Sequence, residues 1–572
     1  MRHVELEGRG RVLLTDEKHV ATGGEASVYR DGDTAIKVYT DPGAMRTRVP
    51  VEKLQRLMRL RHDHIVAPQG VVRHNDTPVG YYMPFVDGMP LLQAFPTAFW
   101  QRSGFDMAQA LRIVAQMRDI VQYAHDAGAV VADPNEMNWL LVGEGDDVQV
   151  YAIDVDAWGI KGFGAHVVAP SVRDYHAAAF TPASDWFGWA VVTFQLLTGI
   201  HPYKGVLSPY KRHDLEARMR DNASVFAPGV RLPSAVRPFA QIPSALLAYY
   251  QAVFQDGLRE SPPMIGGTAR TVSIAASVRV VPAVARGALT WRVVYDQQPI
   301  AHVYLGGLAR TREGLLVDLA THDVLLRDVP ADAVVVRQSD SVLVAVMDDG
   351  APVLRVIRAH HKPQIAALHL QGVMRFVSAE GRLFAVTHRS LTEVQVLQMG
   401  RTLIATAGTA WPILPHALQW FDGVGVQDAL GARHLVVPDV QKGCAMVRVP
   451  ELDGARIVSV VRRNRVAVVT TVDHAGNYRR RVIVMDSKLK EYTIDVVADA
   501  EDGIVPHVVL PKGVVATIVE DGVLEISVPS TGKRQRIRDG ALRTDMRLAH
   551  NNNDVYVVTP DGVVQHITMT AQ

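Results

Sequence analysis

The sequence has little cysteine, almost no net charge and no long run of apolar residues. The single cysteine, Cys444, excludes a disulfide framework within the chain and fits a reducing compartment. The net charge of +1 excludes a global basic field of the kind that attracts nucleic acid, so no nucleic-acid partner is expected. The longest apolar run, residues 186–197, is too short to cross a bilayer, and it contains Gln195. We therefore expect no membrane insertion.

The N-terminal stretch lacks the apolar segment that a signal peptide needs, because charged residues run through MRHVELEGRGRV. We therefore expect a cytoplasmic protein. What the sequence does have is length: 572 residues are more than one hydrophobic core normally holds, so two or more domains are expected. Hydrophobic residues make up 48% and charged residues 21%, a balance typical of a globular protein.

The pattern of apolar residues changes near residue 265. Before that point, short strand-like runs are followed by longer helical patterns: 11–14, 35–39, 80–86, 106–127 and 185–198. The pairs Pro262-Pro263 and Gly266-Gly267 are typical of a boundary. We therefore expect a first domain over residues 1–262, a linker over residues 263–284 and a second domain over residues 285–572.

The second half repeats a short turn between Val-rich runs of about five residues. The seven turns are Glu313-Gly314, Asp349-Gly350, Glu380-Gly381, Asp422-Gly423, Ala475-Gly476, Asp521-Gly522 and Asp561-Gly562. Their gaps of 36, 31, 42, 53, 46 and 40 residues predict an all-β propeller of six or seven blades. A strand near residues 270–300 would complete the last blade and close the ring. The alternative is a stack of β-sandwiches, because WD and Kelch signatures are absent.

The residues that carry chemistry lie in the first half, beginning with a glycine pair and a lysine. Gly23 and Gly24 stand between two strand-like runs, where glycine lets the backbone approach a phosphate and offer N–H donors. Lys37, in Ala-Ile-Lys on the next strand, supplies a compact positive charge. Glu52, fifteen residues later in an expected helix, would hold that lysine through an ion pair; the alternative is a solvated glutamate.

A second group of polar residues follows, with oxygen ligands at regular spacing. Asp133 and Asn138 are five residues apart, and Asp154 and Asp156 follow the next apolar strand. Carboxylate and amide oxygens suit Mg²⁺ bound to nucleotide phosphates, and a carboxylate left off the metal can deprotonate a hydroxyl. Taken alone, Asp-Pro-Asn at residues 133–135 also reads as an ordinary turn.

Taken in order, these motifs resemble the protein-kinase superfamily over residues 12–260. The resemblance implies an α+β bilobal fold, with an N-lobe over about residues 1–86 and a C-lobe over about residues 87–262. It assigns catalysis to Asp133, Lys37, Asn138 and Asp154, and Mg²⁺ to Asn138, Asp154 and Asp156. It assigns the binding of ATP to the glycine loop, its flanking strands, the helix carboxylate and the hinge: Gly23, Gly24, Ala26, Ser27, Val28, Ala35, Lys37, Glu52, Met83 and Phe85.

A closer resemblance is to a bacterial kinase-like branch often found beside tellurite-resistance-type genes, whose third motif is Asp-x-Asp. Several positions depart from the superfamily: Val131-Ala132 replaces His-Arg, Asn135 replaces a lysine and Asp156 replaces a glycine. We expect an ATP- and Mg²⁺-dependent protein kinase with Ser/Thr-type chemistry, whose propeller face binds a protein substrate or partner. The alternatives are a pseudokinase scaffold, which binds nucleotide weakly or not at all and acts through protein–protein interactions of the propeller, and a kinase of a small molecule.

Overall fold

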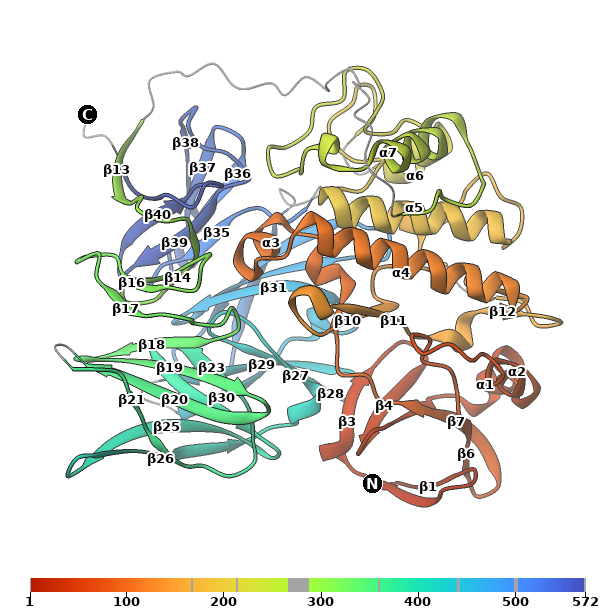
Figure 1. Cartoon of the computed structure of the whole chain (residues 1–572), viewed down its shortest axis with the longest axis horizontal. Helices are drawn as coiled ribbons and strands as arrows, with labels where there is room; N and C mark the ends of the chain where they lie inside the picture. The colour runs from red at the N-terminus through yellow and green to blue at the C-terminus, as the bar shows by residue number, and fades with distance from the viewer. Residues whose placement is uncertain are drawn as a thin grey trace.

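The structure is a computed structural model that describes residues 2–165, 168–211, 214–265, 288–358, 361–439, 443–497 and 503–569. Three parts can be followed along the chain in Figure 1. We call residues 2–85 the sheet unit, residues 86–265 the helical unit and residues 288–569 the ring. Most of the predicted linker, residues 266–284, lies outside the described residues.

The sheet unit is one seven-stranded antiparallel sheet with the order β2-β1-β6-β7-β5-β4-β3. Its strands are β1 Arg2–Leu6, β2 Gly10–Leu14, β3 His19–Thr22, β4 Ala26–Asp31, β5 Thr34–Tyr39, β6 Gly70–His74 and β7 Thr77–Pro84. Two short helices follow β5, α1 Pro42–Arg48 and α2 Val51–Leu57. Strands β5 and β7 approach closely at Gly80, because a Cβ atom there would lie 1.9 Å from the carbonyl oxygen of Lys37.

The helical unit is built around two long helices. Its helices are α3 Thr97–Ser103, α4 Met107–Asp126, α5 Pro182–Thr198, α6 Leu215–Arg220 and α7 Ser244–Gln251. Helix α4 begins at a capping box formed by Asp106 and Gln109. Helix α5 is buried on nearly every side, which explains why its sequence is the longest apolar run of the chain. None of the helices in the described ranges has the length and apolar content needed to span a membrane.

Five short strands, one before α3 and four between α4 and α5, place the loops of the helical unit. Strands β8 Met89–Pro90, β10 Trp139–Val142 and β11 Gln149–Ala152 form a three-stranded sheet, and β9 Ala129–Val130 pairs with β12 Gly159–Ile160. The β10–β11 hairpin aligns Trp139 with Ala152, and the N–H of Ile153 donates to the carbonyl of Asn138 at 2.9 Å. The hairpin therefore brings residues 138 and 154 to the same end of the sheet.

The ring consists of seven separate sheets, six of four strands and one of five. The first three are β14 Ile300–Tyr304, β15 Leu308–Thr311, β16 Leu316–Asp318, β17 Val324–Leu326; β18 Val334–Gln338, β19 Ser341–Asp348, β20 Ala351–Arg358, β21 Gln364–Ile365; and β22 Ala367–His369, β23 Val373–Ala379, β24 Arg382–Thr387, β25 Ser390–Met399, β26 Thr402–Pro412.

The next three are β27 Leu418–Trp420, β28 Gly425–Ala429, β29 Ala432–Asp439, β30 Gly443–Arg448; β31 Arg456–Arg463, β32 Val466–Val472, β33 Tyr478–Met485, β34 Tyr492–Val497; and β35 His507–Val509, β36 Val515–Glu520, β37 Val523–Val528, β38 Lys533–Arg538. The seventh combines β13 Leu289–Tyr295 with β39 Arg547–Asn551, β40 Asp554–Val558 and β41 Val564–Met569.

The seven sheets form a closed cycle. Each sheet shares a hydrophobic cluster with the next, and one cluster that contains Tyr295, Ile300 and Val564 joins the seventh sheet back to the first. The expected closing strand is β13, which pairs antiparallel with β41 from Leu289 opposite Met569. The all-β character predicted for this half is confirmed. Each predicted turn joins two neighbouring strands of one sheet, and each of the seven sheets contains one of the turns.

The ring and the helical unit share one hydrophobic core. Val458, Val472 and Tyr478 of the ring belong to the same buried cluster as α4 and α5. Ser234 donates from its N–H and hydroxyl to Asp521 at 3.1 and 2.8 Å, which adds a polar contact at the same interface. The boundary near residue 265 is therefore a boundary in sequence and secondary structure, while the packing continues across it.

Candidate active site

Lys37 lies at the centre of the predicted site and binds two carboxylates. Its ammonium contacts Asp154 Oδ1 at 2.8 Å and the two oxygens of Asp156 at 2.9 and 3.0 Å. The Lys37 side chain is 12% exposed and that of Asp154 is 49% exposed, so the pair joins a nearly buried ammonium to a carboxylate that reaches solvent. Burial alone would lower the pKa of Lys37, but Asp154 and Asp156 raise it well above its ordinary value and keep the ammonium charged.

Asp156 is the buried anchor of this group. Besides Lys37, its carboxylate accepts hydrogen bonds from the hydroxyls of Tyr39 and Tyr81, the latter at 2.6 Å. Burial alone would raise the pKa of Asp156, but Lys37 and the two tyrosines lower it. Both carboxylate oxygens are thus engaged by the protein, so Asp156 holds Lys37 in place. This contact with Lys37 is not one that the resemblance implied for Asp156, to which it assigned Mg²⁺.

Glu52 does not make the predicted ion pair. It is exposed in the first turn of α2, and the ion pairs of Lys37 among the described residues go to Asp154 and Asp156 instead. The neighbouring Lys53 is fully buried and donates to the carbonyl of Asp156 at 2.7 Å. Burial lowers the pKa of Lys53 to about 8. Helix α2 therefore binds the carbonyl of Asp156 through the ammonium of Lys53, whereas the sequence predicted that it would bind Lys37 through a carboxylate.

Asp133 lies in a loop whose hydrogen bonds fix its carboxylate. Oδ1 accepts from the N–H of Ala169 at 3.0 Å, and Oδ2 accepts from Asn135 Nδ2 at 2.8 Å. The Asn138 amide donates to the carbonyl of Asp133 at 2.9 Å, which ties the two predicted residues together. Burial raises the pKa of Asp133, and the bonds from Ala169 and Asn135 oppose that rise. A carboxylate in this state is more basic than one in water.

The backbone before Asp133 is held by a fully buried carboxylate, Asp185 of α5. Its oxygens accept from the N–H groups of Val131 and Ala132 at 2.7 and 2.8 Å, and from His125 Nε2 at 2.9 Å. Ala132 has φ 63°, a left-handed conformation that costs free energy in a residue with a Cβ atom. Asp185 therefore stabilises the backbone turn that presents Asp133.

The residues predicted to contact a nucleotide lie around one apolar wall of the sheet unit. Ala26, Ala35 and Met83 are buried in one cluster, with Val28 and Phe85 half-buried against it. Gly23 and Gly24 form the turn between β3 and β4, closed by a hydrogen bond from the N–H of Gly23 to the carbonyl of Ala26 at 2.9 Å. The Ser27 hydroxyl bonds to that of Thr22 at 2.9 Å, which ties β4 to β3.

The ring contacts the surroundings of this site in both the helical unit and the sheet unit. In the helical unit, Glu136 of the Asp133 loop forms an ion pair with Arg456 at 3.1 Å, and both side chains are nearly buried at 6% and 11%. The N–H of Ser171 donates to the carbonyl of His474 at 3.4 Å. In the sheet unit, strand β3 packs against β28 of the ring. The ring therefore bridges the helical unit and the sheet unit beside the candidate site.

The donor set suits a divalent cation with nucleotide phosphates. The Nδ2 of Asn138 is used by Asp133, which leaves the amide oxygen of Asn138 to face a ligand, and Asp154 keeps one carboxylate oxygen outside its contact with Lys37. Two oxygen donors at one end of the β10–β11 hairpin, beside a fixed ammonium, fit Mg²⁺ and a phosphate chain. Asn138 and Asp154 would hold the cation, and Lys37 would face the phosphates.

No protein-family model matches the chain, and a search of curated proteins finds no match. The function must therefore be argued from the residues of this chain.

Sequence reasoning missed Tyr39, Tyr81, Lys53, Asp185 and the role of Asp156. Two of them could have been found from strand alternation, because residues i and i+2 of a strand share a face. Tyr39 is two residues after Lys37 on β5, and Tyr81 lies directly opposite Lys37 on β7. For Asp185 no local signal exists, because its partners are about fifty residues away in sequence.

Proposed function

We propose that the chain is an ATP- and Mg²⁺-dependent phosphotransferase of the protein-kinase type, and that the ring is a seven-bladed β-propeller docked against its active site. The observation that supports the enzyme is that Lys37 contacts Asp154, which lies 117 residues later in sequence, while the bond from the N–H of Ile153 to the carbonyl of Asn138 brings the Asp133 loop to the same place. The observation that supports the propeller is the closed cycle of seven sheets completed by β13 and β41.

Each residue has a chemical role in this proposal. When bound, ATP would supply the phosphoryl group and Mg²⁺ would neutralise much of the negative charge of the phosphates. Lys37, held by Asp156, stabilises the negative charge of the phosphates, and Asn138 and Asp154 hold the cation. Asp133 orients the acceptor hydroxyl and takes its proton, for which its raised basicity is suited. The propeller would position a protein substrate or partner beside the Asp133 loop.

The proposal is tested by incubating the full chain with labelled Mg²⁺-ATP and candidate protein acceptors. Asp133→Asn is expected to reduce phosphate transfer by about 10²- to 10⁴-fold, the usual contribution of a general base. Stabilisation of the variant by Mg²⁺-ATP in a thermal melt should remain, because Asp133 is not assigned to the nucleotide. The matched control is Asp119→Asn, an exposed carboxylate on α4.

If the wild-type chain is stabilised by Mg²⁺-ATP but transfers no phosphate, and Asp133→Asn equals it, the enzyme proposal is wrong and a pseudokinase scaffold is favoured. If Mg²⁺-ATP stabilises neither chain, the proposed nucleotide site is wrong, and of the alternatives only a scaffold that does not bind nucleotide is left.

The acid limb of the pH profile gives a separate prediction for Asn135. Asp133 accepts a proton only when ionised, so transfer is lost as the pH falls through its folded-state pKa, which burial raises. The amide of Asn135 favours the ionised form. Asn135→Ala should therefore raise that pKa, and the midpoint of the acid limb of kcat/KM should move to higher pH by on the order of one unit. A midpoint that stays in place or moves to lower pH would contradict the assignment of Asp133 as the base.

A further inference from the structure

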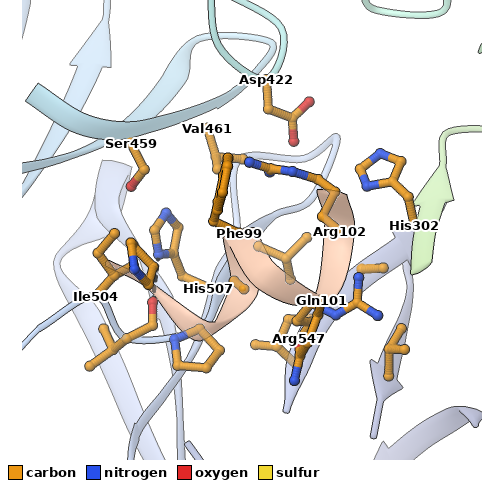
Figure 2. A pocket seen from close by; sticks show the side chains of 18 of the residues that line it. Phe99, Gln101, Arg102, His302, Asp422, Ser459, Val461, Ile504, His507 and Arg547 are labelled. Carbon is orange, nitrogen blue, oxygen red and sulfur yellow. Dashed lines mark hydrogen bonds between the residues drawn. The ribbon is translucent and has the colours of Figure 1, made fainter. Parts of the chain in front are cut away.

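Helix α3 of the helical unit closes a cavity in the middle of the ring. The cavity measures about 870 Å³ and is lined by the first strands of the sheets, including β14, β18, β31, β35 and β39. Phe99 and Arg102 of α3 face into it (Figure 2). Helix α3 is held from behind by Arg237, whose buried guanidinium stacks on Trp100 at 3.9 Å and donates to the carbonyl of Phe95.

Three arginines that line this cavity, Arg102, Arg231 and Arg547, form no ion pair within the described residues, and Arg102 and Arg547 lie near each other. Arg102 is exposed to the cavity and makes no ion pair or hydrogen bond within the described part of the chain. Arg547 donates to the backbone carbonyls of Ile300 and Ala301, and its Nε is buried with no partner. Charged side chains inside a protein are normally paired, so two guanidinium groups without acids indicate that their counter-charge comes from outside the chain.

Three of the five carboxylates that line the same cavity form ion pairs with other arginines, while Asp521 is held by neutral donors and Glu520 is exposed. Asp422 binds Arg463 at 2.8 Å, Asp545 binds Arg543, and Glu380 contacts Arg462 at 3.3 Å. Asp521 accepts four hydrogen bonds from Ser234 and Thr544. Glu520 is exposed at the end of β36. Asp422 is the acid that lies near Arg102, and its ion pair with Arg463 leaves Arg102 in excess.

Arg102 and Arg547 lie close enough to influence each other and His302. Burial and, to a smaller extent, the nearby Arg102 and Arg312 together lower the pKa of Arg547 to about 9. Burial lowers the pKa of His302 to about 3, with Arg102 and Arg547 adding to the effect. His302 is therefore neutral at pH 7 and offers a hydrogen bond beside the two cations.

We propose that this cavity binds a small organic anion, a phosphate or carboxylate compound, whose acidic group pairs with Arg102 and Arg547. A guanidinium donates two parallel hydrogen bonds to either group. The apolar side chains of Phe99, Val461 and Ile504, which also line the cavity, would contact the rest of the ligand (Figure 2). This site is separate from the proposed nucleotide site, and it holds the ring and α3 together when filled.

The test uses tripolyphosphate and citrate as probes of the full chain. Either probe is expected to bind saturably in isothermal titration calorimetry, and Arg102→Gln should weaken that binding by about 10-fold or more, since a hydrogen bond to a charged group contributes about 1.5–3 kcal/mol. The control is Arg59→Gln, an exposed arginine after α2, which should bind as the wild type does. Arg102→Gln breaks no described contact, so its fold should be unchanged.

Hydrogen exchange locates the bound probe. The amides of α3 and β39 should exchange more slowly with the probe present, and this protection should be absent in Arg102→Gln. Binding of tripolyphosphate alone would identify a phosphate site, and binding of citrate alone a carboxylate site. The proposal is overturned if neither probe binds at millimolar concentration, if Arg102→Gln and Arg59→Gln bind equally, or if protection is confined to the sheet unit.

Discussion

Replacing Asp156 with alanine is expected to lower the free energy of unfolding by about 3 to 5 kcal/mol, the usual cost of removing one partner of a buried ion pair. The Asp156 side chain is 7% exposed and that of Lys37 12%, so the loss would leave a buried ammonium and two buried tyrosine hydroxyls short of an acceptor. Urea unfolding of the full chain measures the difference.

The matched variant is Asp154→Ala. Its side chain is 49% exposed and contacts Lys37 through one oxygen, so its loss should cost less than about 1 kcal/mol of stability. If Asp154 holds the cation, the same variant should abolish Mg²⁺-dependent transfer. The two aspartates would then differ in kind, one needed for folding and the other for chemistry. Equal losses of stability for the two variants would show that Asp156 is not the anchor of Lys37.

The ion pair between the ring and the Asp133 loop carries the second large prediction. Arg456→Ala is expected to cost about 3 to 5 kcal/mol, because Glu136 would remain buried without a cation. Transfer of phosphate should slow as well, since Glu136 is three residues after Asp133. Stability is measured by urea unfolding and transfer with labelled Mg²⁺-ATP.

Two comparisons separate the lost pair from a lost side chain. The double variant Glu136→Gln with Arg456→Met removes both charges and should be markedly more stable than Arg456→Ala. Arg220→Ala breaks the exposed pair with Glu216 on α6 and should cost about 0.5 kcal/mol or less. A loss as small for Arg456 as for Arg220 would mean that this contact does not couple the ring to the loop.

Much of the fold was within reach of the sequence because its signals are local. The predicted helices 106–127 and 185–198 match α4 and α5, and the seven turns mark seven sheets.

The uneven gaps between turns also have a structural cause. Most of these turns join the second and third strands of the meander, whereas Glu380-Gly381 and Asp422-Gly423 join the first and second. The gap from Asp349 to Glu380, the first of these two turns, is therefore short, at 31 residues. The gap from Asp422, the second of them, to Ala475 is long, at 53 residues.

The ion pair predicted for Glu52 was wrong because the prediction did not consider which face of the helix is buried. The expected ion pair relied on a distance in sequence from Lys37, while the inward face of α2 is set by Lys53, Leu54 and Leu57, which are all buried. Glu52 lies one residue before that face. The contacts of the ring with Glu136 and Ser171 were beyond sequence reasoning altogether, because no local pattern records which surfaces of two folded parts meet.

The pairing of β13 with β41 has a consequence for synthesis on the ribosome. The helical unit needs Val458, Val472 and Tyr478 to complete its core, and the ring that carries them closes only when β41 has emerged. About 300 residues separate the end of the helical unit from that strand, which at 5–20 residues per second is a delay of roughly 15–60 s. During that time the apolar surface that will receive Tyr478 faces solvent, so the nascent chain passes through an interval in which it depends on chaperones.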